Sequence, residues 1–412
     1  MSAATRDEPH RTAIYATALT AFFAIAGIAV VDPILPVIGS SLGSSTWQIE
    51  LLFTAYIAVM ALGMVPAVMS TGRFGYKKVL TAGVSVVAVA ALAASAVGGI
   101  EQLAALRGLW GLGNAMFFAT AMSLLVALAR QSEWVVELFE TCVGLGFAVG
   151  PLIGGLLGRI SWRVPFLACG VLMVAAAVMS VSRLRDPDER PSRLRFADVV
   201  ASYRKPAFIA LCVLTATYNF AFFVVLGYTP VALRLSVVPL GLVFTAWGIG
   251  LAFGILVVGH RLAHRIGAVA TVGLAVLVLA GCLVGLALST TTAVSIVVLV
   301  LAGVCMGICN ANLTDLALAT GLPDRRSTTG AFNLVRWGFA APAPVISGLV
   351  AEHSGLKAPF WVAVGVLGVS LVVFALTSHV MARAVGERVL WSRWNNRARA
   401  AELSPEEAMG EL

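Results

Sequence analysis

The feature that most constrains this chain is a series of apolar runs, each about long enough to cross a lipid bilayer. A membrane-spanning helix needs about 20 mainly apolar residues, and runs of this length recur from one end of the sequence to the other. Only 12% of the residues are charged, about half the fraction found in soluble domains. Backbone polar groups in lipid must be satisfied within the protein, which leaves helices or a closed barrel. Because the runs are continuous and do not alternate with polar residues, we expect helices.

We expect an all-α membrane protein with twelve spans. An even number of spans places both termini on the same side of the membrane. The first span lacks the short apolar core and small-residue cleavage site of a signal peptide, so we interpret it as a retained helix. The expected spans are residues 12–38, 46–69, 79–98, 103–129, 135–158, 163–182, 206–230, 239–259, 268–288, 293–319, 328–351 and 358–381.

Basic residues are distributed unequally between the two sides. If the N-terminus is cytoplasmic, 22 of the 28 lysines and arginines lie in cytoplasmic segments, four lie on the other side, and Arg107 and Arg336 fall within spans. Cytoplasmic loops of membrane proteins carry such an excess. We therefore expect a multi-pass protein of the cell membrane with both termini in the cytoplasm. The net charge of +8 reflects this topology and contact with the bilayer, and gives no support to nucleic-acid binding.

An internal repeat divides the chain into two halves. The loop STGRFGYKK, with Arg73 and Gly75, resembles the loop GHRLAHRIG, with Arg265 and Gly267, at an offset of 192 residues. A polar segment separates the first six spans from the last six, which is the parallel-repeat plan of one large transporter class. We expect an N-terminal six-helix bundle over residues 1–182, a cytoplasmic linker over 183–205, a C-terminal six-helix bundle over 206–381 and a cytoplasmic tail over 382–412.

A glycine-rich stretch, GLGFAVGPLIGG, forms the outer half of the fifth span. Glycines one helical turn apart let two helix backbones approach closely, and an interior proline bends a helix. With this stretch the chain resembles a major facilitator superfamily transporter over nearly its full length, and most of all the twelve-helix drug:proton antiporters. The resemblance implies that the motif controls the exchange between conformational states, whereas close helix packing without a coupling role is the alternative. The residues concerned are Gly146, Gly150, Pro151, Gly154 and Gly155.

The loop after the second span matches the same family less closely. It retains Arg73, Gly75 and Lys77, but Gly72 stands where the family has an aspartate. The resemblance implies a conformational role for this loop. Without the aspartate, a basic loop that only fixes the topology is an equal alternative.

Two charged residues inside the spans are candidates for proton coupling. RGLWGLGNA resembles the family's fourth-helix motif through Arg107, and AVVDPILP resembles its acidic first-helix motif through Asp32. Helical rise places both at similar depth in the outer half of the membrane. Ionisable groups within the bilayer are expensive and are functional candidates by default. The alternative is a structural ion pair that joins the first and fourth spans.

Other charged residues in the spans are further candidates. Glu140 lies in an ETCVGLG pattern found in some relatives of amine exporters, and Asp315 lies near the inner end of the tenth span. Arg336 lies in the inner half of the eleventh span, within reach of Asp315, where a pair would hold the second half together. Glu50 lies near the outer start of the second span, where its carboxylate can reach water.

Polar and aromatic residues at mid-membrane depth are expected to form the substrate site, because substrates of such folds bind between the halves near the midplane. Their sparse polarity among Phe, Trp and Met indicates an amphipathic or lipophilic ligand. Each of them taken singly can be a helix-packing contact. The candidates are Tyr56, Asn114, Tyr218, Asn219, Trp247, Asn310 and Asn333.

The sequence contains no hydrolase elbow, zinc-protease helix or nucleotide-binding loop, so we expect neither an enzyme nor a cofactor or metal site. The six cysteines all lie within spans, where they pack between helices. We expect a monomer that exports small amphipathic or lipophilic compounds in exchange for protons. Proton-coupled uptake of a small metabolite, or a receptor or assembly protein on the same fold, are the alternatives.

Overall fold

The computed structural model describes residues 4–128, 134–187, 194–321 and 325–387. Over this part of the chain the structure is helical and contains no strand. Twelve helical segments within it are long and apolar enough to cross a membrane. The predicted fold class, an all-α membrane protein with twelve spans, is confirmed.

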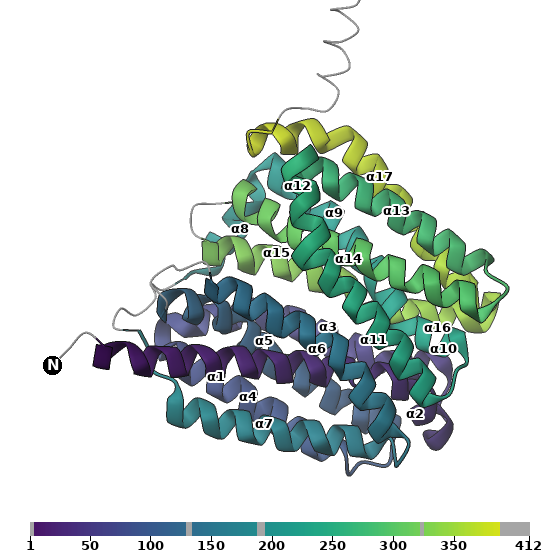
Figure 1. The fold of residues 1–412 in the computed structure, drawn as a ribbon, viewed down its shortest axis with the longest axis horizontal. Coiled ribbons are helices and arrows are strands. Elements are labelled where there is room, and N and C mark those ends of the chain that lie inside the picture. The colour runs from purple at the N-terminus through teal and green to yellow at the C-terminus, as the bar shows by residue number, and fades with distance from the viewer. Residues whose placement is uncertain (1–3, 129–133, 188–193, 322–324, 388–412) are drawn as a thin grey trace, which may run out of the picture.

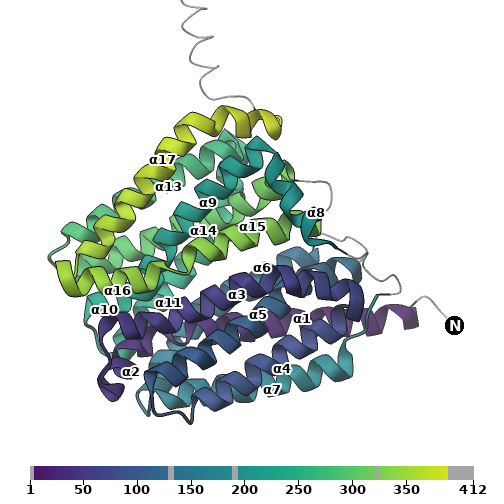
Figure 2. The ribbon, with the colours of Figure 1, turned by 180° about the vertical axis from the view of Figure 1, so that it is seen from behind.

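The helices form two bundles that lie side by side (Figures 1 and 2). The first bundle, coloured from purple through blue to teal, contains α1 (Ala4–Ala29), the short turn η1 (Asp32–Ile34), α2 (Leu35–Leu42), α3 (Thr46–Phe74), α4 (Tyr76–Ala94), α5 (Ile100–Leu128), α6 (Trp134–Gly158) and α7 (Arg163–Arg183).

A short connecting helix, α8 (Phe196–Ala201), and the turn η2 (Ser202–Arg204) precede the second bundle, which is coloured from teal through green to yellow. The bundle contains α9 (Pro206–Phe223), the π-helical turn η3 (Val224–Tyr228), α10 (Thr229–Leu233), α11 (Val237–Phe253), the π-helical turn η4 (Gly254–Gly259), α12 (His260–Ile266), α13 (Ala268–Leu288), α14 (Thr292–Thr320), α15 (Arg325–Ala340), α16 (Ala343–Ser354) and α17 (Ala358–Ala384).

Several spans are interrupted helices. The first span breaks before η1, where Pro33 follows Asp32, and the eleventh breaks between α15 and α16 at Pro342. Proline has no amide hydrogen and cannot continue the ladder of helical hydrogen bonds. The seventh and eighth spans instead contain the wider turns η3 and η4, a kind of irregularity that is frequent at functional sites.

The two ends of the molecule are named here for what lies at them. The linker end is the end where α1 begins and where α8 lies, and the η1 end is the opposite end, where α2 and α10 lie (Figure 1) and where η1 leads directly into α2. At the linker end, the hydroxyl of Tyr203 donates to the Ala331 carbonyl at 2.7 Å and Lys205 Nζ donates to the Gly321 carbonyl at 2.6 Å. Burial raises the pKa of Tyr203, which keeps its hydroxyl protonated to a higher pH than that of an exposed tyrosine. The segment before α9 is thereby fixed to the second bundle.

At the η1 end, α3 of the first bundle packs on α16 of the second. The Trp47 amide in the first turn of α3 donates to Glu352 Oε1 of α16 at 3.3 Å. The Val345 amide in the first turn of α16 donates to Thr54 Oγ1 of α3 at 3.4 Å. The first amides of a helix have no partner within the helix, so each of these two helices supplies an acceptor to the free end of the other.

Candidate functional site

A cluster of polar side chains is buried in the first bundle near the η1 end. We call it the Asp32 cluster, and its members are Asp32, Glu50, Tyr56, Arg107 and Asn114. They come from η1, α3 and α5, so three spans meet there. Asn114 Nδ2 donates to the Tyr56 hydroxyl at 2.8 Å, which fixes the tyrosine between α3 and α5.

Arg107 lies among aromatic rings. Its guanidinium carbon is 4.7 Å from the ring centre of Tyr56, 5.0 Å from that of Trp110 and 6.0 Å from that of Phe53. A cation over an aromatic face is stabilised by about 0.5–2 kcal/mol, more where water is excluded. The guanidinium nitrogens have no hydrogen-bond partner among the described residues. Arg107 thus keeps five donors available inside the bundle.

Asp32 is fully buried and lies within electrostatic range of Arg107. Its two carboxyl oxygens accept no hydrogen bond within the part of the chain that the structure describes. The two groups that the sequence selected are therefore brought into one cluster.

Glu50 was expected near water, and the structure corrects this expectation. The side chain is fully buried, and neither of its carboxyl oxygens has a hydrogen-bond partner among the described residues. A β-carbon built on Gly227 of η3 would lie 2.8 Å from Glu50 Oε2, so the carboxyl group lies directly against the second bundle. The sequence does carry a signal of this burial. Glu50 lies one turn before Phe53 and two turns before Ile57, on the apolar face of α3.

A second polar cluster lies in the second bundle. Arg336 Nη2 donates to Asn310 Oδ1 at 2.6 Å. Arg336 is also within electrostatic range of Tyr218, whose hydroxyl donates to the Met306 carbonyl at 2.8 Å. Trp337 covers the Arg336 guanidinium at 5.4 Å. Three of the predicted residues, from α9, α14 and α15, therefore lie close together.

Trp247 of α11 is fully buried where the two bundles meet. Its ring lies 6.2 Å from Phe147 of α6 and 5.8 Å from Phe222 of α9, both in edge-to-face contact. Its indole nitrogen donates to no acceptor among the described residues. The aromatic group thus joins both bundles and leaves one hydrogen-bond donor available.

The remaining candidates are placed separately. Asn219 Nδ2 donates to the Thr215 carbonyl of its own helix at 3.0 Å, and Asn333 is half-buried in α15. Asp315 is exposed and lies within electrostatic range of His260 of α12. Glu140 belongs to α6, but its side chain lies outside the described residues.

The glycines of the fifth span lie against two different helices. A β-carbon on Gly150 would lie 2.7 Å from the Ala26 carbonyl oxygen, one on Gly146 would lie 2.8 Å from Ile25 Cβ, and Gly154 contacts the backbone of Val30. Gly146 and Gly150 face α1 and Gly154 faces the turn that follows it, whereas Gly155 faces α11 of the other bundle, with a β-carbon 3.0 Å from the Val237 carbonyl oxygen. The helix α6 is therefore packed backbone to backbone on both sides.

Pro151 lies between these contacts. Because proline lacks an amide hydrogen, the carbonyl of Phe147 four residues earlier has no donor within α6. Gly248 of α11 packs directly on this carbonyl, and a β-carbon on Gly241 would lie 2.7 Å from the Pro151 carbonyl oxygen. The proline and its carbonyls thus lie in the contact between the bundles.

The loop between α3 and α4 is contacted by a carboxylate from another segment, although its own sequence motif lacks one. Gly75 has a positive φ of 84°, which favours glycine, and the Lys77 amide donates to Asp186 Oδ1 at 2.7 Å. Lys77 Nζ donates to the Val181 carbonyl at 2.8 Å, while Arg73 is exposed. Asp186 follows α7 and is remote in sequence, so the local motif could not reveal it.

The corresponding loop of the second bundle is built in the same way. Gly267 has a φ of 91°. Glu387 follows α17 and accepts from the Ala268 amide at 2.7 Å and the Val269 amide at 3.2 Å. In each half, an acidic residue that follows the sixth span of that half therefore accepts hydrogen bonds from the first amides of its third span.

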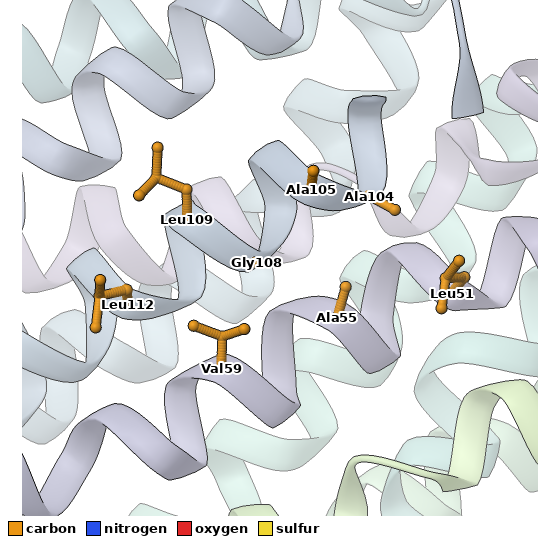
Figure 3. A pocket seen from close by; sticks show the side chains of 8 residues that line it. All are labelled: Leu51, Ala55, Val59, Ala104, Ala105, Gly108, Leu109 and Leu112. Carbon is orange, nitrogen blue, oxygen red and sulfur yellow. The ribbon is translucent and has the colours of Figure 1, made fainter. Parts of the chain in front are cut away.

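An apolar surface groove of about 390 Å³ lies between α3 and α5 (Figure 3). It contains none of the predicted substrate residues. Its lining is entirely apolar and consists of Leu51, Ala55, Val59, Ala104, Ala105, Gly108, Leu109 and Leu112. These residues follow a face of α3 and α5 different from that of the Asp32 cluster, and their composition fits contact with lipid.

Comparison with solved structures shows the same fold in other proteins. The crystal structure of a bacterial homolog to the human lysosomal transporter Spinster, in an inward-facing and unoccupied conformation, superimposes with a TM-score of 0.76 over 93% of this chain and 99% of that one, at 15% identity. The human organic anion transporter MFSD10 matches with a TM-score of 0.68 over 89% of this chain and 99% of that one, at 17% identity.

Sequence comparison is more specific. The multidrug efflux protein YfmO of Bacillus subtilis is 32% identical over 366 residues, which is 88% of this chain and 92% of that protein. The quinolone resistance protein NorA of Staphylococcus aureus is 26% identical over 169 residues, 40% of this chain and 43% of that protein. The family model described as Major Facilitator Superfamily matches residues 17–343. The chain is a multi-pass membrane transporter and belongs to the Major Facilitator Superfamily.

Proposed function

We propose that this transporter exports small amphipathic or lipophilic compounds in exchange for protons. The observation that carries the proposal is the Asp32 cluster, in which Asp32 and Arg107 are fully buried and the atoms that bear their charges have no hydrogen-bond partner among the described residues. Removing such groups from water is costly. A carboxylate that gains and loses a proton during a transport cycle explains why this cost is retained.

The two polar clusters support a substrate site between the bundles. Tyr56 and Asn114 lie in the first cluster and Tyr218 and Asn310 in the second, while Trp247 and Phe147 meet across the contact. Aromatic faces with a few hydrogen-bonding groups fit a ligand that is mostly apolar. The similarity to the multidrug efflux protein YfmO over most of the chain supports the same class of substrate.

The topology completes the proposal. We take the linker end as cytoplasmic because the excess of basic residues lies in the segments at that end. Residues 1–182 and 206–381 then act as two six-helix units joined by a cytoplasmic linker, and one copy of the chain is sufficient for transport. The Asp32 cluster lies in the half of the membrane nearer the external side and receives protons from there.

The test is transport by the whole protein in proteoliposomes. A proton gradient imposed across the vesicle should drive uphill movement of a lipophilic cationic dye, and addition of the dye without a gradient should release protons. Asp32→Asn retains the size and hydrogen bonding of the side chain but not its titration, so it should abolish gradient-driven movement. Glu101→Gln, an exposed carboxylate at the start of α5, is the control and should transport normally.

Two results would contradict the proposal. Wild-type coupling in folded Asp32→Asn protein would exclude Asp32 as the proton carrier, and Glu140 and Asp315 would then be tested in the same way. Movement of substrate in the same direction as protons would replace export by uptake.

A further inference from the structure

Glu50 occupies a place where three interrupted spans meet. Its carboxyl group lies against Gly227 of η3, with Pro344 at the start of α16 beside the same glycine. It is within electrostatic range of Asp32 in η1. Each of these segments departs from regular helix, by a 3₁₀ turn, a π turn or a proline break. Such places are where spans can change their packing with little loss of helical hydrogen bonding.

The closed packing around Glu50 favours the neutral carboxylic acid. An ionised carboxylate here would have no hydrogen bond among the described residues, and a buried charge without a partner is strongly unfavourable. The neutral acid carries no such charge. The closed arrangement of the η1 end is therefore more favourable for the neutral side chain of Glu50 than for the ionised one.

The charged and titratable groups facing Glu50 add to this preference. They are Asp32 from η1, which repels a second negative charge, and Tyr228 from η3. Arg107 of α5 interacts with Asp32 and Tyr56, and Arg234 interacts with Tyr228. On α16, Glu352 binds the Trp47 amide at the start of α3. The two arginines are thus engaged with the neighbours of Glu50.

We propose that Glu50 is a proton-operated latch between the two bundles at the η1 end. With a proton bound, its carboxyl group remains buried against Gly227 and the end is closed. When the O–H bond breaks, the proton passes to water and the carboxylate keeps the bonding electron pair, and α3 then separates from η3 and α16 so that the carboxylate is hydrated. This inference rests on the proposed proton-coupled function, and it assigns the closing of the external side to a residue other than the proton carrier Asp32.

The experiment measures the width of the η1 end directly as a function of pH. Ser40 at the end of α2 and Ser236 before α11 are exposed and belong to different bundles. Spin labels on Ser40→Cys and Ser236→Cys, in full-length protein in nanodiscs with Cys142→Ser, report the distance by pulsed electron paramagnetic resonance. The five other cysteines are buried.

The wild-type distance distribution should shift from short to long as the pH rises. One titrating group changes the ratio of the two forms by up to about tenfold per pH unit. Glu50→Gln, which mimics the neutral acid, should remain short over the whole range. Glu101→Gln, the exposed carboxylate at the same end, should follow the wild type.

A second variant approaches the latch from the other bundle. Gly227→Leu places a branched side chain where the β-carbon alone would lie 2.8 Å from Glu50 Oε2, which a shift of the carboxyl group cannot accommodate, and leaves every titratable group in place. It should lengthen the distance at low pH, where the wild type is closed. A normal low-pH distance in this variant would mean that the contact does not hold the end closed.

The outcomes separate the latch from the proposed function. If Glu50→Gln opens with pH as the wild type does, the latch is wrong, whether or not transport is coupled to protons. If the distance depends on Glu50 while the wild type shows no proton-driven transport, the latch stands and the proposed function fails.

Discussion

At the scale of single residues, the unusual feature is a charge held mainly by aromatic rings. Arg107 packs on Tyr56, Trp110 and Phe53 and has Asp32 within electrostatic range. Aromatic faces stabilise a guanidinium but do not satisfy its donors. The electrostatic interaction between Asp32 and Arg107 should therefore be measurable as a coupling between substitutions.

We expect Arg107→Met to lower the thermal unfolding midpoint in detergent, because it leaves the Asp32 carboxylate buried without a cation. Removing one partner of a buried pair costs about 3–5 kcal/mol. Adding Asp32→Asn should restore part of the loss, since the unpaired charge disappears. Strictly additive effects of the two substitutions would show that the groups do not interact.

The glycines of α6 give a second prediction at this scale. Gly150→Leu should slow transport strongly while leaving equilibrium substrate binding within about twofold, because its side chain would meet the α1 backbone at Ala26 and not the ligand. Gly281→Leu in α13 is the matched control, because no atom lies within 4 Å of its built β-carbon. Loss of binding in proportion to transport, in folded Gly150→Leu protein, would place the motif in the substrate site.

The residues of the Asp32 cluster show what sequence can and cannot predict. Asp32 and Arg107 are recognisable because charges inside apolar runs are rare. Glu50 lies only five residues into its helix, at a depth where most carboxylates reach water, and its burial depends on η3 and α16 from the other half of the chain. A contact of this kind depends on the relative position of two bundles, and local sequence does not encode that position.

At the scale of elements, the same long-range dependence appears in the caps of α4 and α13. The prolines at the breaks in the first and eleventh spans are visible in the sequence. The acceptors for the first amides of α4 and α13, Asp186 and Glu387, lie more than a hundred residues from those amides. The repeat of the two loops was evident from Gly75 and Gly267, but the repeated carboxylates appeared only in the structure.

We expect each of these two carboxylates to protect the first turn of the helix that it caps from hydrogen exchange. Asp186→Ala should speed amide hydrogen exchange in the first turn of α4, consistent with a loss of about 0.5–2 kcal/mol for a missing N-cap, while α13 remains unchanged. Glu387→Ala should do the reverse, so each variant is the control of the other. Asp186→Asn retains an acceptor but not the charge that interacts with the helix dipole, and should lie between wild type and Asp186→Ala. Equal exchange in all variants would show that water replaces the carboxylates at no cost.

At the scale of the whole molecule, closure of the η1 end combines the separate contacts between the bundles. The carboxyl of Glu50, the reciprocal helix caps between α3 and α16, and the packing of Gly155 on α11 all lie at or near this end. None of these contacts is large by itself, and the caps are neutral or singly charged hydrogen bonds of about 1–3 kcal/mol at most. A closed end held by several weak contacts can be opened by changing one of them, which is what an exchange between two states requires.

The orientation of this closed end in the membrane is the last prediction. Ser40→Cys and Ser236→Cys lie at the η1 end, one in each bundle, and Ser182→Cys lies beside the linker. In intact cells, a membrane-impermeant maleimide should label the first two positions and reach Ser182→Cys only after the cells are opened, because the basic residues concentrate at the linker end. Protein with only its native cysteines gives the background, since five of them are buried and Cys142 is partly exposed. Labelling of Ser182→Cys in intact cells would invert the topology, and the latch would then face the cytoplasm. Opposite accessibility of Ser40→Cys and Ser236→Cys would contradict the parallel orientation of the two halves, which a shared site between them requires.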